Sequence, residues 1–284
     1  MDQKPFKGWI ALDIDGTITL DKYSIPQEVI DYLRACTKEG WRIAMATGRP
    51  VVFASIALSK YDFPYLFLPQ NGSCAIEMPE KKCLFKRYIP KSSLHELELA
   101  MEGVASDFLI YTGHENQDRV YFRPKRFDAE QKRYLKAYWE RQKEEGIPVD
   151  SFKEIEQGSF PLIKCFGRLE EMSNLAGRLR QNPLFNVALL RDPFTEDYYI
   201  LLITDRLASK GQSLEAAIAQ LGGPRGILVA AGDDENDASM LEIADVAIAM
   251  EHAPESLQNI AHLIAPPTKE LGILHALQIA LRKS

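Results

Sequence analysis

The spacing of hydrophobic residues switches between two periods along the first part of the chain. Short apolar runs typical of buried strands occur in WIAL, WRIAMATG and YLFLPQNGS. Between them, IPQEVIDYLRACTKEG and VVFASIALSK repeat their apolar residues at helical spacing, and Gly40 is the expected end of the first helix. Strands that alternate with helices predict an α/β fold with a doubly wound, Rossmann-like parallel sheet.

The regular alternation of strands and helices is lost over residues 82–204. The expected strands are CLFKRYI, DFLIY, VYFRP, FPLIKCFG, NVALLR and DYYILLIT, and the last two form a hairpin joined through Asp192 and Pro193. The expected helices are SSLHELELAMEGVA, DAEQKRYLKAYWERQKEEG and EEMSNLAGRLRQN, and a capping box of Ser93 and Glu96 opens the first of them. This segment predicts a separate α+β domain inserted into the first one.

The alternation resumes after the insertion. The expected elements are helix SKGQSLEAAIAQLG, strand GILVAAG, loop DDEND, helix ASMLEIA, strand DVAIAM, helix PESLQNIA and a final amphipathic helix, KELGILHALQIALRK. We therefore predict one core domain, residues 1–81 and 205–284, that is interrupted by an inserted domain, residues 82–204.

The composition favours a small-molecule partner. The 284 residues are 46% hydrophobic and carry a formal net charge of -6, which argues against a general attraction to nucleic acid or to an anionic membrane. No apolar stretch approaches the roughly 20 residues that span a bilayer, and the N-terminal residues lack the apolar core of a signal peptide. We expect a cytoplasmic protein with reduced cysteines, in which Asn71-Gly72-Ser73 is a turn and not a glycosylation site. The sequence does not predict the oligomeric state.

Polar residues follow the predicted strands of the core at the points where the strands end. Asp13 and Asp15 follow the first strand, Thr47 ends the second, and GDDEND closes the strand after the insertion. Lys210 stands at the start of the helix before that strand. Because ligands of open parallel sheets bind beyond the carboxyl ends of the strands, these groups are expected to share one crevice. A phosphate with a divalent cation explains all of them together.

Each of these residue types suits one step of phosphoryl transfer. Asp13 is the candidate nucleophile, since a carboxylate can attack phosphorus and divide one displacement into two easier steps. Asp13 and Asp233 would supply oxygen ligands to Mg²⁺, which a negative nucleophile needs beside a negative phosphate. Asp15 points to the same side of the strand and would protonate the leaving oxygen and later deprotonate the attacking water. Thr47 would donate to a phosphoryl oxygen, and Lys210 would stabilise the transition state.

Every one of these residues also has an ordinary structural explanation. The D-x-D-G-T stretch could be a turn or a calcium-like motif, Thr47 a helix N-cap, Lys210 a solvated helix residue and DDEND a polar loop. Their fixed order along one sheet, each at a strand end or helix start, favours catalysis over these separate explanations.

The motifs DIDGT, TGR, SKG and GDDENDASM, with a domain inserted between the second and third, resemble the haloacid dehalogenase-like superfamily of phosphatases. More narrowly, they are similar to its Cof-type members with a type IIB cap, and the resemblance covers nearly the whole chain. It implies a Mg²⁺-dependent phosphatase that acts on small phosphorylated metabolites, such as sugar phosphates, through an aspartyl phosphate. The inserted domain would then be the cap that selects the substrate.

The resemblance also implies roles for matching positions. Asp13 would be the nucleophile and a metal ligand, and Asp15 the general acid/base, whose backbone carbonyl also touches the metal. Asp233 would be the remaining protein ligand of the metal, which Asp237 would support from nearby. The residues implied to bind phosphate are Ile14, Thr47, Gly48, Lys210 and Asn236. One loop departs from these relatives, since Glu251-His252-Ala253 stands where they commonly have a small residue followed by Asn and Ala.

Substrate-selecting residues are expected in the insertion, where the sequence signals are weak. Lys164, Arg168 and the run RPKRFD at 123–128 could bind an anionic leaving group, although a basic run is more often a solvated surface. Four aromatic residues could stack on a ring but more often pack a core, namely Tyr121, Phe122, Tyr198 and Tyr199.

Two other functions remain open at this point. The first is a phosphomutase of the phosphomannomutase type, which hands the phosphoryl group back to a sugar, although such enzymes typically have a longer, glycine-rich last metal loop than GDDENDASM. The second is a non-catalytic protein that binds a phosphate ligand in the same crevice, which the intact Asp13 and Asp15 disfavour.

Overall fold

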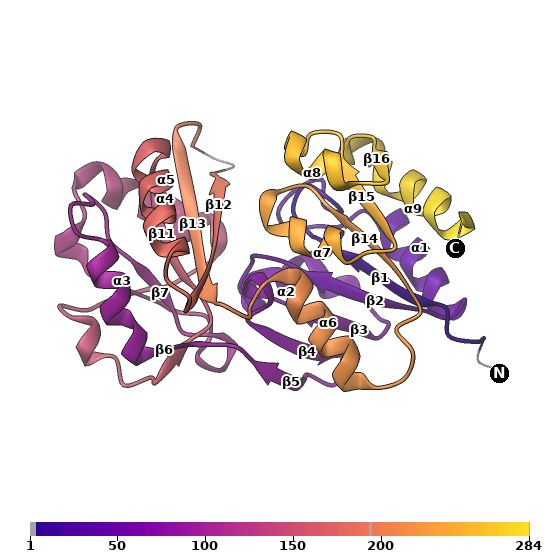
Figure 1. Ribbon diagram of the computed structural model, residues 1–284, viewed down its shortest axis with the longest axis horizontal. Coiled ribbons are helices and arrows are strands. Elements are labelled where there is room, and N and C mark those ends of the chain that lie inside the picture. The colour runs from indigo at the N-terminus through magenta and orange to yellow at the C-terminus, as the bar shows by residue number, and fades with distance from the viewer. Residues whose placement is uncertain (1–3, 193–194, 284) are drawn as a thin grey trace. The chain divides into compact units, whose positions relative to one another are not determined.

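The computed structural model describes residues 4–192 and 195–283, and these form two compact units (Figure 1). Unit 1 comprises the described residues up to Gly48, Ala54–Lys86, and those from Ser209 onward. Unit 2 comprises Arg49–Phe53 and Arg87–Ala208. Pro193, which was expected in a hairpin turn, lies outside the described residues. No helix in the described part of the chain is long and apolar enough to cross a membrane.

A mostly parallel sheet forms the centre of unit 1. Within the described residues its strands run in the order β16, β15, β14, β1, β2, β3, β4 and β5. In that order their bounds are Leu263–Ala265, Val246–Met250, Ile227–Gly232, Gly8–Leu12, Trp41–Ala46, Tyr65–Leu68, Cys74–Met78 and Lys82–Lys86. The strands from β16 to β3 are parallel, whereas β4 and β5 are antiparallel to their neighbours. The predicted doubly wound α/β core is confirmed, with an antiparallel edge that was not predicted.

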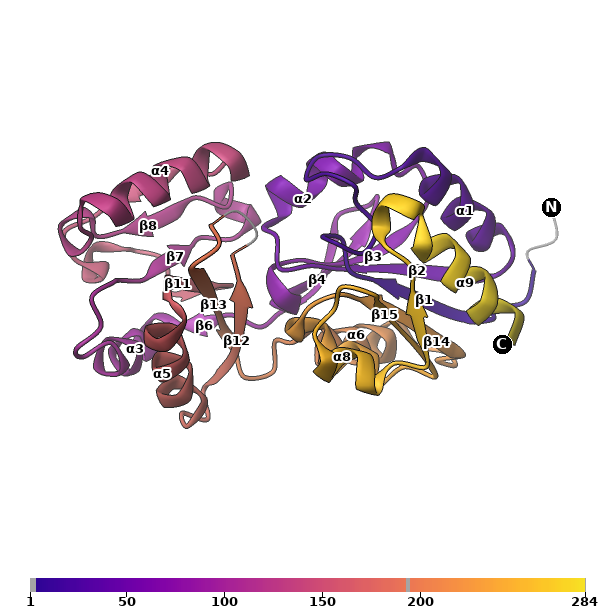
Figure 2. The same cartoon turned by 90° about the horizontal axis from the view of Figure 1, so that it is seen from above.

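Helices cover both faces of this sheet (Figure 2). Helices α1 (Gln27–Lys38) and α9 (Gly272–Lys283) lie on one face, and α6 (Lys210–Leu221) and α8 (Glu255–Ile260) lie on the other. Helix α7 (Ala238–Glu242) shares a buried cluster with α6 and α8. On the second face, Ala11 of β1 is in register with Ala44 of β2 and Ala230 of β14. These small side chains belong to one buried cluster with α6, α7 and α8, and their size lets the helices approach the middle of the sheet closely.

Unit 2 is a mostly antiparallel sheet with helices on both faces, in which only the described pair β8 and β9 is parallel. In the described residues its strand order is β12, β13, β11, β7, β8 and β9, and β6 pairs separately with β10. The bounds in that order are Phe185–Arg191, Tyr198–Asp205, Ile163–Arg168, Leu109–Tyr111, Val120–Phe122, Gly146–Pro148, Ile89–Pro90 and Ser159–Phe160. Helices α3 (Leu94–Ala100) and α5 (Leu169–Arg180) share one buried cluster with the sheet, and α4 (Ala129–Gln142) shares another.

Two details of the expected insertion differ from the structure. The predicted boundary at residue 82 falls too early, because β5 pairs with β4 in the sheet of unit 1 and the change between units comes after Lys86. The predicted capping box at Ser93 is absent, since Ser93 lies in a 3₁₀ turn with helical dihedral angles and its side chain does not cap α3. The box forms instead at α4, between Asp128 and Gln131, where Asp128 has the extended backbone that an N-cap needs.

Helix α2 (Val51–Ala57) follows β2 and continues into a 3₁₀ turn, η1 (Leu58–Lys60). Two further 3₁₀ turns of unit 1 close strands at the carboxyl edge of the sheet, η2 (Gln70–Gly72) after β3 and η7 (Glu235–Asp237) after β14. Thr47 lies between β2 and α2, and Asp233 lies between β14 and η7, whereas Asp13 and Asp15 follow β1 and Lys210 begins α6.

Candidate active site

Two adjacent parallel strands end in the carboxylates that the sequence singled out. Strand β1 pairs in parallel with β2 on one side and with β14 on the other. The strand order therefore reverses at β1, since the strands before the insertion extend the sheet to one side and those after it to the other. Asp13 continues this pairing, because its backbone N–H donates to the carbonyl of Ala231 at 3.0 Å. Asp233 follows the end of β14. A reversal of this kind opens a crevice at the carboxyl ends of the strands, which is where α/β sheets bind ligands.

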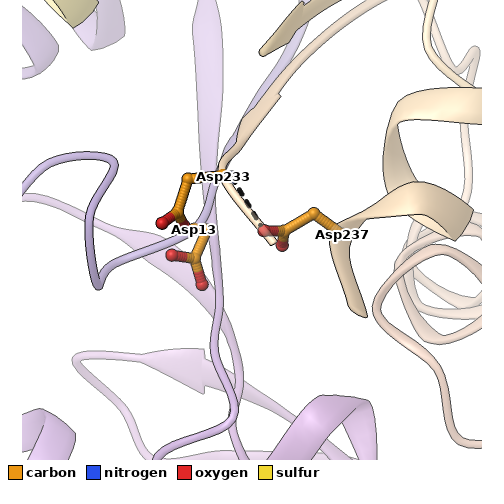
Figure 3. A group of neighbouring side chains, drawn as sticks. All are labelled: Asp13, Asp233 and Asp237. Atoms are coloured by element: carbon orange, nitrogen blue, oxygen red, sulfur yellow. Dashed lines mark hydrogen bonds between the residues drawn. The ribbon is translucent and has the colours of Figure 1, made fainter. Parts of the chain in front are cut away.

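Three carboxylates converge at these strand ends (Figure 3). Asp13, Asp233 and Asp237 each offer an oxygen, and these oxygens lie within 4.8 Å of one another. Asp13 is 4% exposed and Asp237 is fully buried. The Asp237 carboxylate is held by the backbone, since its Oδ2 accepts hydrogen bonds from the N–H groups of Asp233 at 3.0 Å and Asp234 at 3.1 Å. The turn η7 thus fixes one corner of the cluster.

Lys210 provides a positive charge inside the same cluster. It is the first residue of α6 and is 1% exposed, and its Nζ donates to Oδ1 of Asp13 at 2.6 Å and to Oδ1 of Asp237 at 2.5 Å. Burial by itself lowers the pKa of Lys210, but the charges of Asp13 and Asp237 outweigh it and raise the pKa above its ordinary value. The lysine is therefore a charged partner of both carboxylates and not a solvated helix residue.

The carboxylates outnumber this single lysine. Burial raises the pKa of Asp13 well above its usual range; Lys210 opposes this shift, while the charges of Asp237, Asp233 and Asp15 add to it. Burial likewise raises the pKa of Asp233, and His252 opposes that shift. Such a cluster is stabilised by a further cation, and carboxylate oxygens are the ligands that Mg²⁺ prefers. The residues present therefore fit a divalent cation.

Glycines make room for two of the carboxylates. Gly16 has a φ of +71°, and a Cβ atom there would lie 2.1 Å from Oδ2 of Asp233. A Cβ atom on Gly232 would lie 2.4 Å from Cγ of Asp237. Side chains at either position would therefore displace a carboxylate of the cluster.

The remaining predicted residues lie at the same edge of the sheet. Thr47 is fully buried after β2 and anchors the neighbouring loop, since its N–H donates to the carbonyl of Leu68 at 3.0 Å and its own carbonyl accepts from the N–H of Asn71 at 2.8 Å. Gly48 follows it as the last residue of this stretch of unit 1. Nδ2 of Asn236 donates to Oδ1 of Asn71 at 3.1 Å.

The two residues beside Asp13 differ in exposure. Ile14 is fully buried, and its carbonyl accepts from the N–H groups of Ile18 at 3.1 Å and Thr19 at 3.2 Å, which folds the following loop back on itself. Asp15 is partly exposed, and its charge is close enough to raise the pKa of Asp13.

Two residues at this edge were not assigned a role from the sequence. Asn71 is 1% exposed, has a left-handed φ of 59° and holds Asn236, so it belongs to a buried turn and not to a glycosylation site. His252 lies in the loop after β15, and its Nε2 is 3.1 Å from Oδ2 of Asp233. The resemblance drew attention to the loop of His252, but no local pattern in the sequence identifies Asp233 as its partner.

Candidate anion-binding residues of unit 2 are engaged within that unit. Lys164 is 5% exposed, and its Nζ donates to the hydroxyl of Tyr138 at 2.8 Å and lies 4.0 Å from Oε1 of Glu144. Arg168 is exposed and pairs with Asp197 at 2.9 Å. Neither residue presents an unpaired cation in this structure.

The run at 123–128 lines a cavity of about 390 Å³ in unit 2. Arg123 forms a two-pronged ion pair with Asp107, with both distances 2.7 Å, and Lys125 pairs with Asp150 at 2.8 Å. These acidic partners offset the basic charge of the run, so the cavity does not have the charge of an anion site.

The candidate aromatic residues of unit 2 contribute to its packing. Tyr198 is 7% exposed and stacks on Tyr134 with ring centroids 4.7 Å apart. Phe122 packs at the edge of the same cluster, and Tyr121 and Tyr199 pack against the cluster on the opposite face of the sheet. The core-packing interpretation accounts for all four.

Replacement of Lys210 is expected to destabilise the metal-free protein. Lys210→Met leaves the buried carboxylates of Asp13 and Asp237 without their cation, which costs about 3 kcal/mol of the free energy of unfolding. Urea unfolding in EDTA measures this loss. The exposed Lys60 provides a matched control as Lys60→Met. The double variant Lys210→Met/Asp237→Asn should recover part of the loss, and a Lys210→Met stability equal to that of the control would contradict the expectation.

The chain is similar in sequence and in fold to known hydrolases. The chain is 25% identical to the phosphatase YwpJ of Bacillus subtilis over 95% of this chain and 98% of that protein. Its fold matches a haloacid dehalogenase-like hydrolase from Bacteroides thetaiotaomicron with a TM-score of 0.74 at 22% identity, over 96% of this chain and 99% of that one. It also matches the HAD subclass IIB sugar phosphatase BT4131 with a TM-score of 0.75 at 22% identity, over 96% and 98% of the two chains.

The family itself is shown by a match that spans both units. The model of the haloacid dehalogenase-like hydrolases covers residues 10–277, from within β1 to the middle of α9. This range includes the carboxylate cluster, Lys210 and the whole of the inserted segment. The resemblance expected from the motifs is thereby confirmed, and the protein belongs to the haloacid dehalogenase-like hydrolase family.

Proposed function

We propose that this hydrolase is a Mg²⁺-dependent phosphatase that releases phosphate from small phosphorylated metabolites through an aspartyl phosphate on Asp13. The observation that carries the proposal is the convergence of Asp13, Asp233 and Asp237 around Lys210 at the carboxyl ends of β1 and β14. A buried carboxylate beside a lysine and further acidic groups suits an attack on a phosphoryl group once a divalent cation offsets the negative charge.

The reaction follows from the groups present. An oxygen of Asp13 attacks phosphorus, the bond from phosphorus to the leaving oxygen breaks, and Asp15 gives its proton to that oxygen. Water then attacks the phosphorus of the aspartyl phosphate while Asp15 takes a proton from it. The bond from phosphorus to Asp13 breaks, which releases inorganic phosphate and restores the carboxylate. Lys210 stabilises the charge that gathers on the phosphoryl oxygens in both steps.

The cation would be held by the side chains of Asp13 and Asp233 and by the backbone carbonyl of Asp15, with Asp237 in support. When bound, it supplies positive charge that lets a carboxylate approach a phosphate. Thr47, Gly48, Asn236 and the backbone at Ile14 would complete the phosphate site. The buried Thr47 and the hydrogen bond from Asn236 to Asn71 support this part of the proposal, since they hold both residues at the same sheet edge as Asp13.

Unit 2 would act as the cap that selects among phosphoesters. The groups that the proposed chemistry needs all belong to unit 1, which leaves unit 2 free to vary with the leaving group. Sugar phosphates are the substrate class that we favour, because a structure of similar fold belongs to a sugar phosphatase. The net charge of the chain also favours a small substrate over nucleic acid.

The purified protein is expected to release phosphate from p-nitrophenyl phosphate and from members of a hexose phosphate panel when Mg²⁺ is present. EDTA should abolish this release and added Mg²⁺ should restore it, because the carboxylates repel the substrate without a cation. A colorimetric phosphate assay measures both effects. Asp13→Asn prepared in parallel controls for contaminating phosphatases. Failure to hydrolyse any phosphomonoester would refute the proposal, and conversion of hexose phosphates without phosphate release would indicate a mutase.

A further inference from the structure

His252 occupies a position that the proposed chemistry does not use. It lies in the loop after β15, and its side chain is 49% exposed. The imidazole faces the carboxylate cluster, with Nε2 at 3.1 Å from Oδ2 of Asp233. The side chain of Asp233 is 18% exposed. A histidine therefore forms one wall of the site at the outer side of Asp233.

The loop that carries His252 is held firmly by its own hydrogen bonds. Nε2 of Gln258, on α8, donates to the carbonyls of Glu251 and Ala253 at 2.9 Å each, and these two residues flank the histidine. The N–H of Glu251 donates to the carbonyl of Ala265 on β16 at 2.9 Å. Because the backbone is fixed on both sides of His252, the imidazole is presented to Asp233 from a rigid base.

Both carboxylate oxygens of Asp233 have hydrogen-bonding neighbours. Oγ1 of Thr17 lies 3.4 Å from Oδ1, and Nε2 of His252 lies 3.1 Å from Oδ2. Gly16 packs against Oδ2 so closely that a Cβ atom there would stand 2.1 Å away. Contacts at both ends of a carboxylate restrict its rotation about the bond to Cβ. The contact from Thr17 is long, so the imidazole provides the firmer of the two hydrogen bonds.

We infer that His252 is a positioning residue that donates its Nε2–H to Asp233 and holds this carboxylate in the orientation that binds the divalent cation. The inference rests on the proposed function, which makes Asp233 a metal ligand. A ligand held by an outer hydrogen bond loses less freedom on binding than a rotating one. Loss of such outer partners typically lowers metal affinity by about 10- to 100-fold.

The test is a calorimetric titration with Mn²⁺ alone, without substrate, at about pH 8, where most imidazoles are neutral. The wild type is expected to bind the ion, and His252→Ala should raise Kd by about 10-fold or more. His252→Gln should retain most of the affinity, because its amide N–H reaches about as far as imidazole Nε2. The exposed His275 on α9 gives the matched control His275→Ala, which should bind as the wild type does.

A double-mutant cycle with Gln258 separates positioning from general loss of structure. Gln258→Ala should weaken Mn²⁺ binding in the wild type but add little to His252→Ala, since its effect passes through the histidine. Phosphatase activity should follow the same pattern, with a raised Mg²⁺ requirement and a kcat that largely recovers at saturating Mg²⁺. Thermal unfolding of each variant checks that the fold is retained.

Three results would overturn the inference while the proposed function stands. They are wild-type affinity in His252→Ala, tighter binding in His252→Ala than in the wild type, and a His252→Gln variant as weak as His252→Ala. A wild-type protein that binds no Mn²⁺ and needs no divalent cation for activity would instead overturn the metal-dependent function itself, and this inference with it.

Discussion

Asp13→Asn is expected to reduce phosphate release by at least about 10⁴-fold while the protein remains folded. The amide is isosteric with the carboxylate but cannot form the bond to phosphorus. It can still accept the hydrogen bond from Lys210, which lies 2.6 Å from Oδ1 of Asp13. Since the substitution also removes one charge from a buried acidic cluster, the free energy of unfolding should not fall. Steady-state phosphate release and urea unfolding measure the two effects.

A matched substitution makes the first prediction specific. Asp62 is an exposed aspartate of unit 1 that pairs with Arg34 at 2.8 Å and has no part in the proposed reaction. Asp62→Asn should therefore keep wild-type activity. Acid quenching of the enzyme with ³²P-labelled substrate should trap label on the wild type and none on Asp13→Asn. Retention of more than a few per cent of activity in Asp13→Asn, with contaminants excluded, would show that another group attacks phosphorus.

Asp15→Asn is expected to slow turnover of an alkyl phosphate by about 10²- to 10⁴-fold, because it removes proton transfer in both steps. With p-nitrophenyl phosphate the first step should suffer less, since nitrophenolate leaves without a proton, whereas the attack of water still needs a base. A rapid burst of nitrophenol close to one per enzyme should therefore precede a slow steady state. Stopped-flow absorbance at the nitrophenolate band measures the burst.

The comparison of variants sharpens this second prediction. Asp13→Asn should show no burst, because it forms no phosphoenzyme, and the wild type should show little, because it hydrolyses the phosphoenzyme quickly. Equal losses on alkyl and aryl phosphates, without a burst, would assign Asp15 a purely structural role. Unchanged rates would remove it from the mechanism altogether.

The central part of the fold and the carboxylate cluster could be predicted because both follow from local patterns. Apolar runs of strand length located β1, β2 and β14, and parallel strands bring their carboxyl ends to one edge. Asp13 and Asp233 were expected to meet there because each follows a predicted strand, and Lys210 because it begins a predicted helix. Their observed contacts agree with that reasoning, while their catalytic roles remain predictions.

The features that the sequence did not predict depend on long-range pairing. No strand was predicted over Cys74–Met78 (β4), and the strand at β5 was assigned to the insertion, because its antiparallel pairing with β4 cannot be read from apolar spacing alone. Strands β9 and β16 span three residues each and lie outside the apolar runs from which strands were predicted. The partner of His252 lies in another loop of the sheet edge, and the distance of 3.1 Å to Asp233 arises only when β14 and β15 pair.

The pairing of β1 with β14 has a consequence for how the chain acquires its structure. Gly8 is in register with Ile227, roughly 220 residues further along the chain, so this contact closes a very long loop. A chain made from its N-terminus cannot form that pair until β14 has been synthesised, whereas Arg87–Ala208 is continuous and complete before then. During synthesis β1 lacks one neighbour and exposes an apolar edge. Asp13 and Lys210 therefore cannot meet until the whole inserted segment has been synthesised, so the length of that segment delays completion of the carboxylate cluster.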